Sequence, residues 1–304
     1  MAQISFQIMS DLHLETPAAR PSYKDFAAEL IPQSPYLALL GDIGYACDSR
    51  LYQFLEAQLQ QYEIVFFLLG NHEAYDLQFQ TAKEKLQEFA AKMDSGRGSG
   101  GTGRFVLLDQ IRFDVDESVT VLGCTLFSFI PVEQEGTVHM FVTDFSRIQD
   151  WHVEDHNMHH ESDVEWLEDQ VDSLAKNEPE RTIIIFTHHS PTIHESSKDP
   201  KQVGDASQVS SAFSTDLSKR SFWTSPQVKL WAFGHTHFNC DFEDPQTGKR
   251  VFTNQKGYRR SENETFDAQK VVTIVVLSGK PNLTDERRRA GLERPTKPRR
   301  CMVM

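Results

Sequence analysis

The sequence predicts an α/β fold whose strands are joined by helical crossover connections. Three observations lead to this prediction. Short apolar, β-branched runs recur along the chain, and several are apolar throughout, as is typical of strands buried on both faces. Amphipathic helical stretches separate the early runs. The 304 residues, of which 39% are hydrophobic, can bury a substantial core in one large domain or two small ones.

Strands and helices alternate in the early part of the chain. Apolar runs predict strands at residues 4–9, 36–40, 64–69, 119–126, 182–186, 228–233 and 271–277. Helices are expected at residues 23–30, 51–61 and 79–93, between the first strands. A further helix is expected from about residue 162 to 175, because Val164, Leu167, Val171 and Leu174 would share one side.

Two segments interrupt this pattern. Residues 94–104 contain five glycines, a composition typical of a flexible surface loop. The polar, serine-rich residues 195–225 are longer than an ordinary connection and suit a cover or specificity loop, in which Ser210, Phe213 and Trp223 serve specificity or only packing. We expect a single domain over residues 1–280 and a basic, disordered tail over residues 281–304.

The charge distribution is uneven. The formal net charge is −13, which disfavours a groove for nucleic acid because phosphate-binding surfaces are normally basic. Residues 287–300 hold six arginines and one lysine against Glu293 and therefore carry +6, which leaves −13 − 6 = −19 for the remainder. An acidic body thus carries a basic tail.

The cysteines and the apolar runs bear on the compartment. Cys47, Cys124, Cys240 and Cys301 lie far apart and form no C-x-x-C pair. The sequence shows neither a secretory leader nor an apolar run of 18 residues or more. We therefore expect a cytoplasmic protein with reduced thiols.

The last four residues, Cys301-Met302-Val303-Met304, fit the C-a-a-X pattern for farnesylation of Cys301. A lipid chain beside a polybasic segment would form a two-signal anchor, so peripheral membrane association is one expectation for a eukaryotic source. A soluble, disordered tail is the alternative.

Residues suited to metal binding follow the predicted strands. They are Asp11 and His13, Asp42, Asn71 with His72, His188, and His235 with His237. Ligands of open α/β sheets bind at the carboxyl ends of the strands, so these residues can converge. Two divalent ions about 3.5–4 Å apart need a shared carboxylate with imidazole and amide ligands, and Asp42 is the natural bridge.

Glycines precede Asp42, Asn71 and His235 in the sequence. They suit tight turns where a side chain would hinder the close approach of a phosphate.

Five motifs carry a resemblance to a known family. Asp11-Leu12-His13, Gly41-Asp42, Gly70-Asn71-His72-Glu73, His188 and Gly234-His235-Thr236-His237 resemble, in order, the signatures of calcineurin-like metallophosphoesterases. Asn254 and Tyr258 are similar to small fungal and bacterial members. The resemblance implies a four-layer α/β/β/α sandwich with mixed sheets.

The resemblance also implies a ligand set. One ion would be held by Asp11, His13, Asp42 and His237, and a second by Asp42, Asn71, His188 and His235. A metal-bridging hydroxide would attack phosphorus in line, and His72 would assist the leaving group while Glu73 or another carboxylate orients its ring. The metals could be manganese, iron, zinc or magnesium, because this ligand set accepts each of them.

Further histidines have open roles. His189 is a candidate for substrate contact. The cluster His152, His156, His159 and His160 is interpreted as a surface segment leading into the helix at 162–175. If that segment is helical, an i, i+4 pair could hold a metal. Alternatively, His156 and Asn157 line the substrate pocket.

The expected activity is hydrolysis of a small-molecule phosphodiester or phosphomonoester. Protein phosphatases of this superfamily extend the second motif with Asp-Arg-Gly, whereas Ile43, Gly44 and Tyr45 follow Asp42 here. A protein phosphatase is therefore the alternative, and a non-catalytic scaffold with the same fold is a further one.

Overall fold

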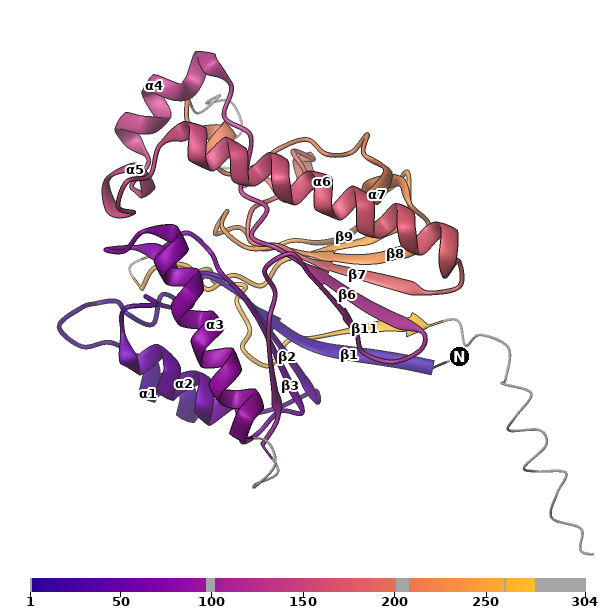
Figure 1. The fold of residues 1–304 in the computed structure, drawn as a ribbon, viewed down its shortest axis with the longest axis horizontal. Helices are drawn as coiled ribbons and strands as arrows, with labels where there is room; N and C mark the ends of the chain where they lie inside the picture. The colour runs from indigo at the N-terminus through magenta and orange to yellow at the C-terminus, as the bar shows by residue number, and fades with distance from the viewer. Residues whose placement is uncertain (1, 97–101, 201–207, 260, 277–304) are drawn as a thin grey trace, which may run out of the picture.

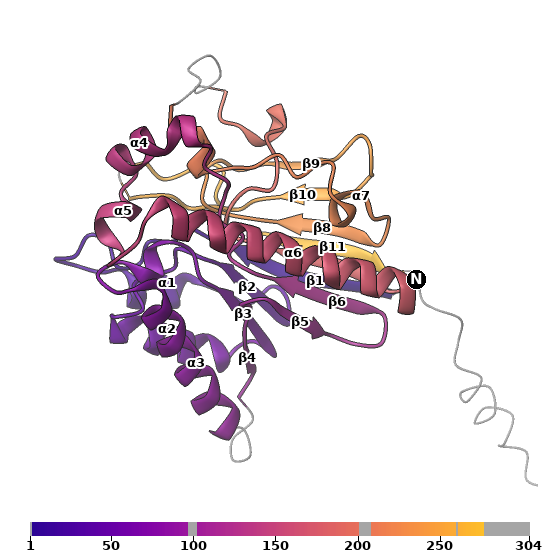
Figure 2. The same cartoon turned by 45° about the horizontal axis from the view of Figure 1, so that its top comes forward.

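The computed structural model describes residues 2–96, 102–200, 208–259 and 261–276. Two β-sheets pack face to face, and helices cover the outer face of each sheet (Figures 1 and 2). The layers follow the order α/β/β/α, and each sheet contains both parallel and antiparallel strands. The predicted four-layer sandwich with mixed sheets is confirmed.

The first sheet has the strand order β11-β1-β2-β3-β4. β1 (Ala2–Met9), β2 (Tyr36–Leu40), β3 (Ile64–Leu68) and β4 (Arg104–Leu107) are parallel, and β11 (Val271–Val276) pairs antiparallel with β1. The crossovers contain α1 (Tyr23–Glu29), α2 (Ser49–Leu59) and α3 (Phe79–Gly96), which cover the outer face of this sheet.

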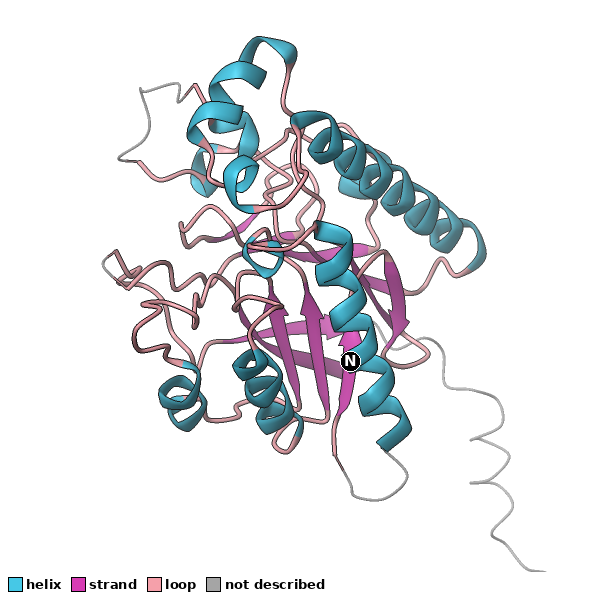
Figure 3. Ribbon diagram, turned by 60° about the vertical axis from the view of Figure 1, so that its left-hand side comes forward, coloured by secondary structure: helices cyan, strands magenta, loops and turns pink. Residues whose placement is uncertain are grey.

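The second sheet has the order β5-β6-β7-β8-β10-β9. β6 (Val119–Gly123), β7 (Thr182–Phe186), β8 (Val228–Ala232) and β10 (Arg250–Phe252) are parallel, whereas the edge strands β5 (Ile111–Asp114) and β9 (Asp241–Glu243) are antiparallel to their neighbours. The outer face is covered by α6 (Val153–Asn177) and α7 (Ser221–Thr224). Before α6, α4 (Val132–Phe141) and α5 (Asp144–Arg147) lie at one end of the sandwich (Figure 1). Figure 3 shows the strands in the interior with helices on the outside.

Three apolar layers hold the sandwich together. The layer between the sheets contains Phe6, Phe66 and Phe186, whose ring centroids are 5.6 to 6.2 Å apart. Along β7, Ile184 and Phe186 face this layer, while Ile183 and Ile185 face the helices on the other side. The apolar run from Ile183 to Phe186 is therefore buried on both faces, as the sequence predicts.

The histidine-rich segment before residue 162 is not a surface lead-in, and that prediction is wrong. α6 begins at Val153, because the backbone N–H of His152 donates to Asp155 Oδ2 at 2.9 Å and completes a cap at the N-terminus of the helix. His156 and His160 are buried in the first turns.

The two interrupting segments are more structured than expected. α3 continues to Gly96 and β4 begins at Arg104, so the connection between them is shorter than the predicted loop of residues 94–104. Residues 97–101 lie outside the described residues. The predicted cover loop contains short 3₁₀ helices (Glu195–Ser197 and Ser210–Ala212) and α7, while residues 201–207 lie outside the description.

The basic tail and Cys301 also lie outside the described residues, so farnesylation stays a prediction. The other three cysteines are free thiols. Within the described part of the chain, no helix combines the length and the apolarity needed to cross a membrane.

Candidate metal centre

The carboxyl ends of five parallel strands carry the predicted metal ligands. β1, β2 and β3 of the first sheet and β7 and β8 of the second each end a few residues before one of these side chains. The structure brings all seven together at this end of the sandwich: Asp11, His13, Asp42, Asn71, His188, His235 and His237. Six of them are buried, and the His237 side chain is 26% exposed.

The first group consists of Asp11, His13 and His237. One potential donor atom from each lies within 4.8 Å of the others. His13 Nε2 is 3.0 Å from His237 Nε2, which in turn is 3.3 Å from Asp11 Oδ1. Lone-pair atoms that converge in this way repel one another, and a cation between them would relieve that repulsion.

The second group surrounds His188. Its Nε2 is 3.1 Å from Asn71 Oδ1 and 3.4 Å from Asp42 Oδ1. The ring of His235 lies 5.0 Å from the ring of His188 between centroids. This set of imidazole, amide and carboxylate donors is typical of sites for divalent transition metals.

Asp42 lies between the two groups. Its Oδ1 faces His188, whereas its Oδ2 is 4.0 Å from His13 Nε2. One carboxylate therefore presents a different oxygen to each group, which is the arrangement that a bridging ligand requires.

The ring nitrogens of the second group are also suitably arranged. His188 Nδ1 is 2.8 Å from Leu40 O, and donation of its N–H to this carbonyl leaves the Nε2 lone pair free for a metal. His235 Nε2 is similarly placed, 3.3 Å from Ala212 O. Burial lowers the pKa of His188 to about 4 and that of His235 well below its ordinary value, which favours the neutral imidazoles that bind metals.

The pKa values of the two aspartates shift in opposite directions. Burial and the nearby carboxylates of Glu73 and Asp11 raise the pKa of Asp42 well above its ordinary value. Burial also opposes ionisation of Asp11, but the hydrogen bond and charge of His237 hold the pKa of Asp11 below its ordinary range. A buried carboxylate crowded by other carboxylates, as Asp42 is, gains from a neighbouring cation, so the donor set fits metal ions.

The backbone of the site is unusual because five of the predicted ligands have positive φ. The angles are 53° for Asp11, 44° for His13, 55° for Asp42, 69° for His235 and 52° for His237. Residues other than glycine rarely adopt this left-handed conformation, and it is concentrated at functional sites. The turns after β1, β2 and β8 thus hold these side chains in place at a conformational cost.

The glycines of the motifs leave room for the ligands themselves. A Cβ added at Gly70 would collide with Asp42 Oδ1, and one at Gly234 would lie 2.7 Å from Asp11 Oδ2. The sequence alone suggests that these glycines allow the close approach of a phosphate. The structure shows a nearer cause, since ligand side chains from other strands already occupy the space.

The sequence suggests Glu73 or another carboxylate as the group that orients His72, but the hydrogen bonds of Glu73 go to the backbone instead. Glu73 is fully buried, and its two oxygens accept backbone N–H groups of Asp42, Ile43 and Gly70 at 2.7 to 3.0 Å. Burial raises the pKa of Glu73 to about 7, against the lowering effect of these donors. Glu73 therefore ties the loop after β2 to the loop after β3.

Glu15 takes the orienting position beside His72, a role that sequence reasoning missed. Its Oε1 is 3.3 Å from His72 Nδ1 and 3.5 Å from His13 Nδ1. Burial opposes its ionisation, yet the adjacent imidazoles of His13 and His72 lower the pKa of Glu15 to about 2. Its position two residues after His13, in Asp11-Leu12-His13-Leu14-Glu15, was an available signal.

Asp144 was also missed, because it lies on the short helix α5, far from every motif. Its Oδ1 accepts hydrogen bonds from Asn71 Nδ2 and from Tyr75 OH, both at 2.7 Å. The first bond turns the amide oxygen of Asn71 towards His188. The sequence contains no local pattern that identifies this contact.

The candidate substrate contacts His189 and His156 are both buried. His189 stacks on His235 with centroids 3.9 Å apart, and neither of its ring nitrogens has a hydrogen-bond partner in the described structure. The Nε2 of His156 accepts from the Ser128 backbone at 3.3 Å. Contact of either residue with substrate stays a prediction, and none of the candidate metal groups found in the described residues contains His156.

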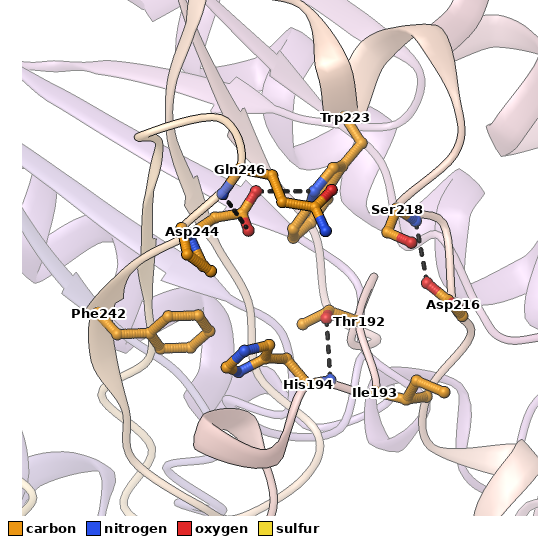
Figure 4. Close-up of a pocket in the computed structure, with 10 residues that line it drawn as sticks. Thr192, Ile193, His194, Asp216, Ser218, Trp223, Phe242, Asp244 and Gln246 are labelled. Atoms are coloured by element: carbon orange, nitrogen blue, oxygen red, sulfur yellow. Dashed lines mark hydrogen bonds between the residues drawn. The ribbon is translucent and has the colours of Figure 1, made fainter.

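The cover-loop residues contact other parts of the site region. Phe213 stacks on His235 at 5.0 Å, directly after the 3₁₀ helix that begins at Ser210. Trp223 is 4% exposed and donates from Nε1 to Asp244 Oδ2 at 3.1 Å. Trp223 lines a pocket of about 240 Å³ together with His194, whose ring stacks on that of Phe242, another lining residue (Figure 4). The predicted metal ligands do not line this pocket.

Comparison with known proteins finds chains that are similar to this one in sequence or in fold. An uncharacterised protein of Acanthamoeba polyphaga mimivirus is 26% identical over 275 residues, which cover 84% of this chain and 91% of the viral protein. The structure of a phosphopantetheinyl hydrolase from Mycobacterium tuberculosis is similar with a TM-score of 0.62 and 16% identity, over 85% of this chain and 91% of that one. A dimetal phosphatase from Danio rerio gives a TM-score of 0.47 and 13% identity, over 82% and 86% of the two chains.

The family profile described as calcineurin-like phosphoesterase matches residues 4–239. This range includes all the predicted ligands, from Asp11 to His237. The chain belongs to the calcineurin-like phosphoesterase family and is a metal-dependent phosphoester hydrolase.

Proposed function

We propose that the protein hydrolyses a small-molecule phosphodiester or phosphomonoester at a centre for two divalent ions. Asp11, His13, Asp42 and His237 would hold one ion, and Asp42, Asn71, His188 and His235 the other. The observation that carries this proposal is the position of Asp42, whose two oxygens face the two groups separately.

The ions, when bound, would supply positive charge that acidifies water and neutralises phosphoryl oxygens. The protein contributes the orientation of His72. Glu15 faces Nδ1, which leaves Nε2 as the nitrogen that can give a proton to the departing oxygen. The backbone N–H of His72 also donates to Asp42 Oδ1 at 2.9 Å, so the same residue orients the bridging carboxylate.

The surroundings of His72 support a small organic phosphoester over a phosphoprotein. Tyr45 lies 6.2 Å from the His72 ring, in the part of the second motif where protein phosphatases have a charged extension. Ala46, the next residue, is buried. An aromatic side chain at this position suits an organic leaving group, and the acidic body disfavours a polyanionic partner.

The test combines metal analysis with hydrolysis of aryl phosphomonoesters and phosphodiesters by the full-length protein. We expect bound divalent metal, loss of activity on chelation, and strong loss of hydrolysis in Asp42→Asn and His72→Ala. Asp172→Asn, on the exposed side of α6, is the matched control. A protein without metal that cleaves none of these substrates would contradict the proposal, and an active Asp42→Asn protein would refute the bridging role.

A further inference from the structure

Tyr258 lies against the metal centre, 21 residues beyond the last predicted ligand. Its ring stacks on His13 with centroids 4.2 Å apart and meets His237 edge-on at 4.9 Å. Its hydroxyl is 3.0 Å from His72 Nε2. The residue is nevertheless 41% exposed, so a molecule that enters from solvent can reach it.

The backbone holds Tyr258 in a fixed position relative to Asp11. Lys256 N donates to Ser10 O at 3.2 Å, and Gly257 N donates to Asp11 O at 2.9 Å. Gly257 has φ +78°, a conformation that favours glycine and turns the chain so that the next side chain points back over His13. The segment before Tyr258 is thus docked on the same strand end that carries two predicted ligands.

The 3.0 Å separation between the hydroxyl and His72 Nε2 has a geometric consequence. Two groups at this distance can both contact one further oxygen at ordinary hydrogen-bond lengths of about 2.7–3.0 Å. An oxygen within reach of His72 Nε2 is therefore also within reach of the phenol. Phenol O–H groups are hydrogen-bond donors, so the hydroxyl can stabilise negative charge on that oxygen.

We propose that Tyr258 is a further catalytic residue that donates a hydrogen bond to the leaving-group oxygen. This inference rests on the proposed function, in which His72 serves the same oxygen. The P–O bond to the leaving group breaks as a new P–O bond forms to the oxygen of water. The attacking water releases a proton to solvent, and His72 supplies the proton that the leaving oxygen takes up and later regains one from solvent. Tyr258 keeps its own proton throughout.

The effect of the phenol should depend on the leaving group. A poor leaving group such as phenol develops more negative charge on its oxygen than 2,4-dinitrophenol does, so it gains more from a hydrogen-bond donor. Removal of a hydrogen bond to a charged oxygen corresponds to about 10- to 100-fold in rate. We expect Tyr258→Phe to lose this factor in kcat with phenyl esters and less than about threefold with 2,4-dinitrophenyl esters.

The experiment measures kcat for a series of aryl phosphoesters with the metal-loaded, full-length protein. Tyr258→Phe keeps the aromatic ring and hence the stacking on His13. Tyr36→Phe is the matched control, because Tyr36 begins β2 and lies at the end of that strand opposite to Asp42 and the metal centre. Metal content and melting temperature are measured for each variant, since a purely structural role would change these and lower all rates equally.

Four outcomes decide the inference. A loss that grows with the pKa of the leaving group, with full metal content, supports it. An equal loss across the series, or no loss, overturns it while leaving the proposed function intact, and so does an equal dependence in Tyr36→Phe. A wild-type protein inert towards every ester overturns the proposed function and this inference with it.

Discussion

Glu73→Gln is the sharpest test of how the site is assembled. The substitution changes little in size but replaces one carboxylate oxygen with an amide NH₂ group. Asp42 N and Gly70 N donate to Oε2 at 3.0 and 2.7 Å, and Ile43 N and Gly44 N donate to Oε1 at 2.8 and 3.4 Å. Whichever oxygen is replaced, two backbone donors then face another donor.

The hydrogen bonds of Glu73 determine how much the free energy of unfolding should fall. Above pH 7, where the Glu73 carboxylate is ionised because its pKa is about 7, a hydrogen bond to a charged group contributes about 1.5–3 kcal/mol, so the loss of two costs about 3–6 kcal/mol. Removal of a fully buried charge offsets part of this cost, and we expect the free energy of unfolding to fall by about 2–4 kcal/mol. For a domain of this size, that corresponds to a melting temperature lower by about 4–15 °C.

Thermal unfolding by circular dichroism checks the stability of the metal-free protein, and elemental analysis checks the number of ions per chain. We expect Glu73→Gln also to retain less metal, because the loops that carry Asp42 and Asn71 are no longer tied together. Glu88→Gln, on the exposed side of α3, is the control. A melting temperature within about 2 °C of wild type, with undiminished metal content, would refute this reasoning.

Three other substitutions test separate parts of the structure. Asp144→Ala removes the shorter of the two hydrogen bonds that Asn71 Nδ2 donates, so we expect metal affinity to fall about 10- to 100-fold in a calorimetric titration, and an unchanged affinity would contradict this orienting role. Burial lowers the pKa of Lys249 to about 7 from 10.5, an effect that Asp244 opposes and Lys229 adds to. The folded state then binds fewer protons than the unfolded state between these values, so wild type should gain stability relative to Lys249→Met as pH rises from 7 towards 10.5, and a constant difference in urea denaturation would count against it. Phe186→Ala opens a cavity between the sheets and should cost about 3–5 kcal/mol in the same assay, with a loss below about 1 kcal/mol as the contrary result.

The central strands were predictable from the sequence because their physics is local. β2 and β7 match the predicted ranges because every position except Thr182 is apolar, and few other structures accommodate such short, buried runs. The edge strands β5 and β9 were not predicted. They have only three or four residues each and are largely exposed, so their pairing depends on neighbours that the sequence does not show as adjacent.

The site residues also divide into those that the local sequence predicts and those that it does not. The ligand positions follow buried strands, and the common direction of parallel strands is enough to bring them to one end of the sheets. The supporting contacts of Asp144 and Tyr258 depend on the docking of α5 and of the segment after β10, which no periodicity reveals. The sequence names Glu73 or another carboxylate as the partner of His72, and it could not identify Glu15 because adjacency in the motif says nothing about the direction of the side chain.

The pairing of β1 with β11 has a consequence for synthesis of the chain. Gln7 pairs with Val271, and the intervening 263 residues take about 13–53 s to synthesise at about 5–20 residues per second. During that time one edge of β1 has no permanent partner, and such an edge can pair with another nascent chain unless a chaperone shields it. The segment that docks on Ser10 and Asp11 also emerges late. A nascent chain that already contains every predicted ligand, but not residues 256–257, lacks the two backbone hydrogen bonds to Ser10 and Asp11, so we expect stable metal binding only after this segment has been synthesised.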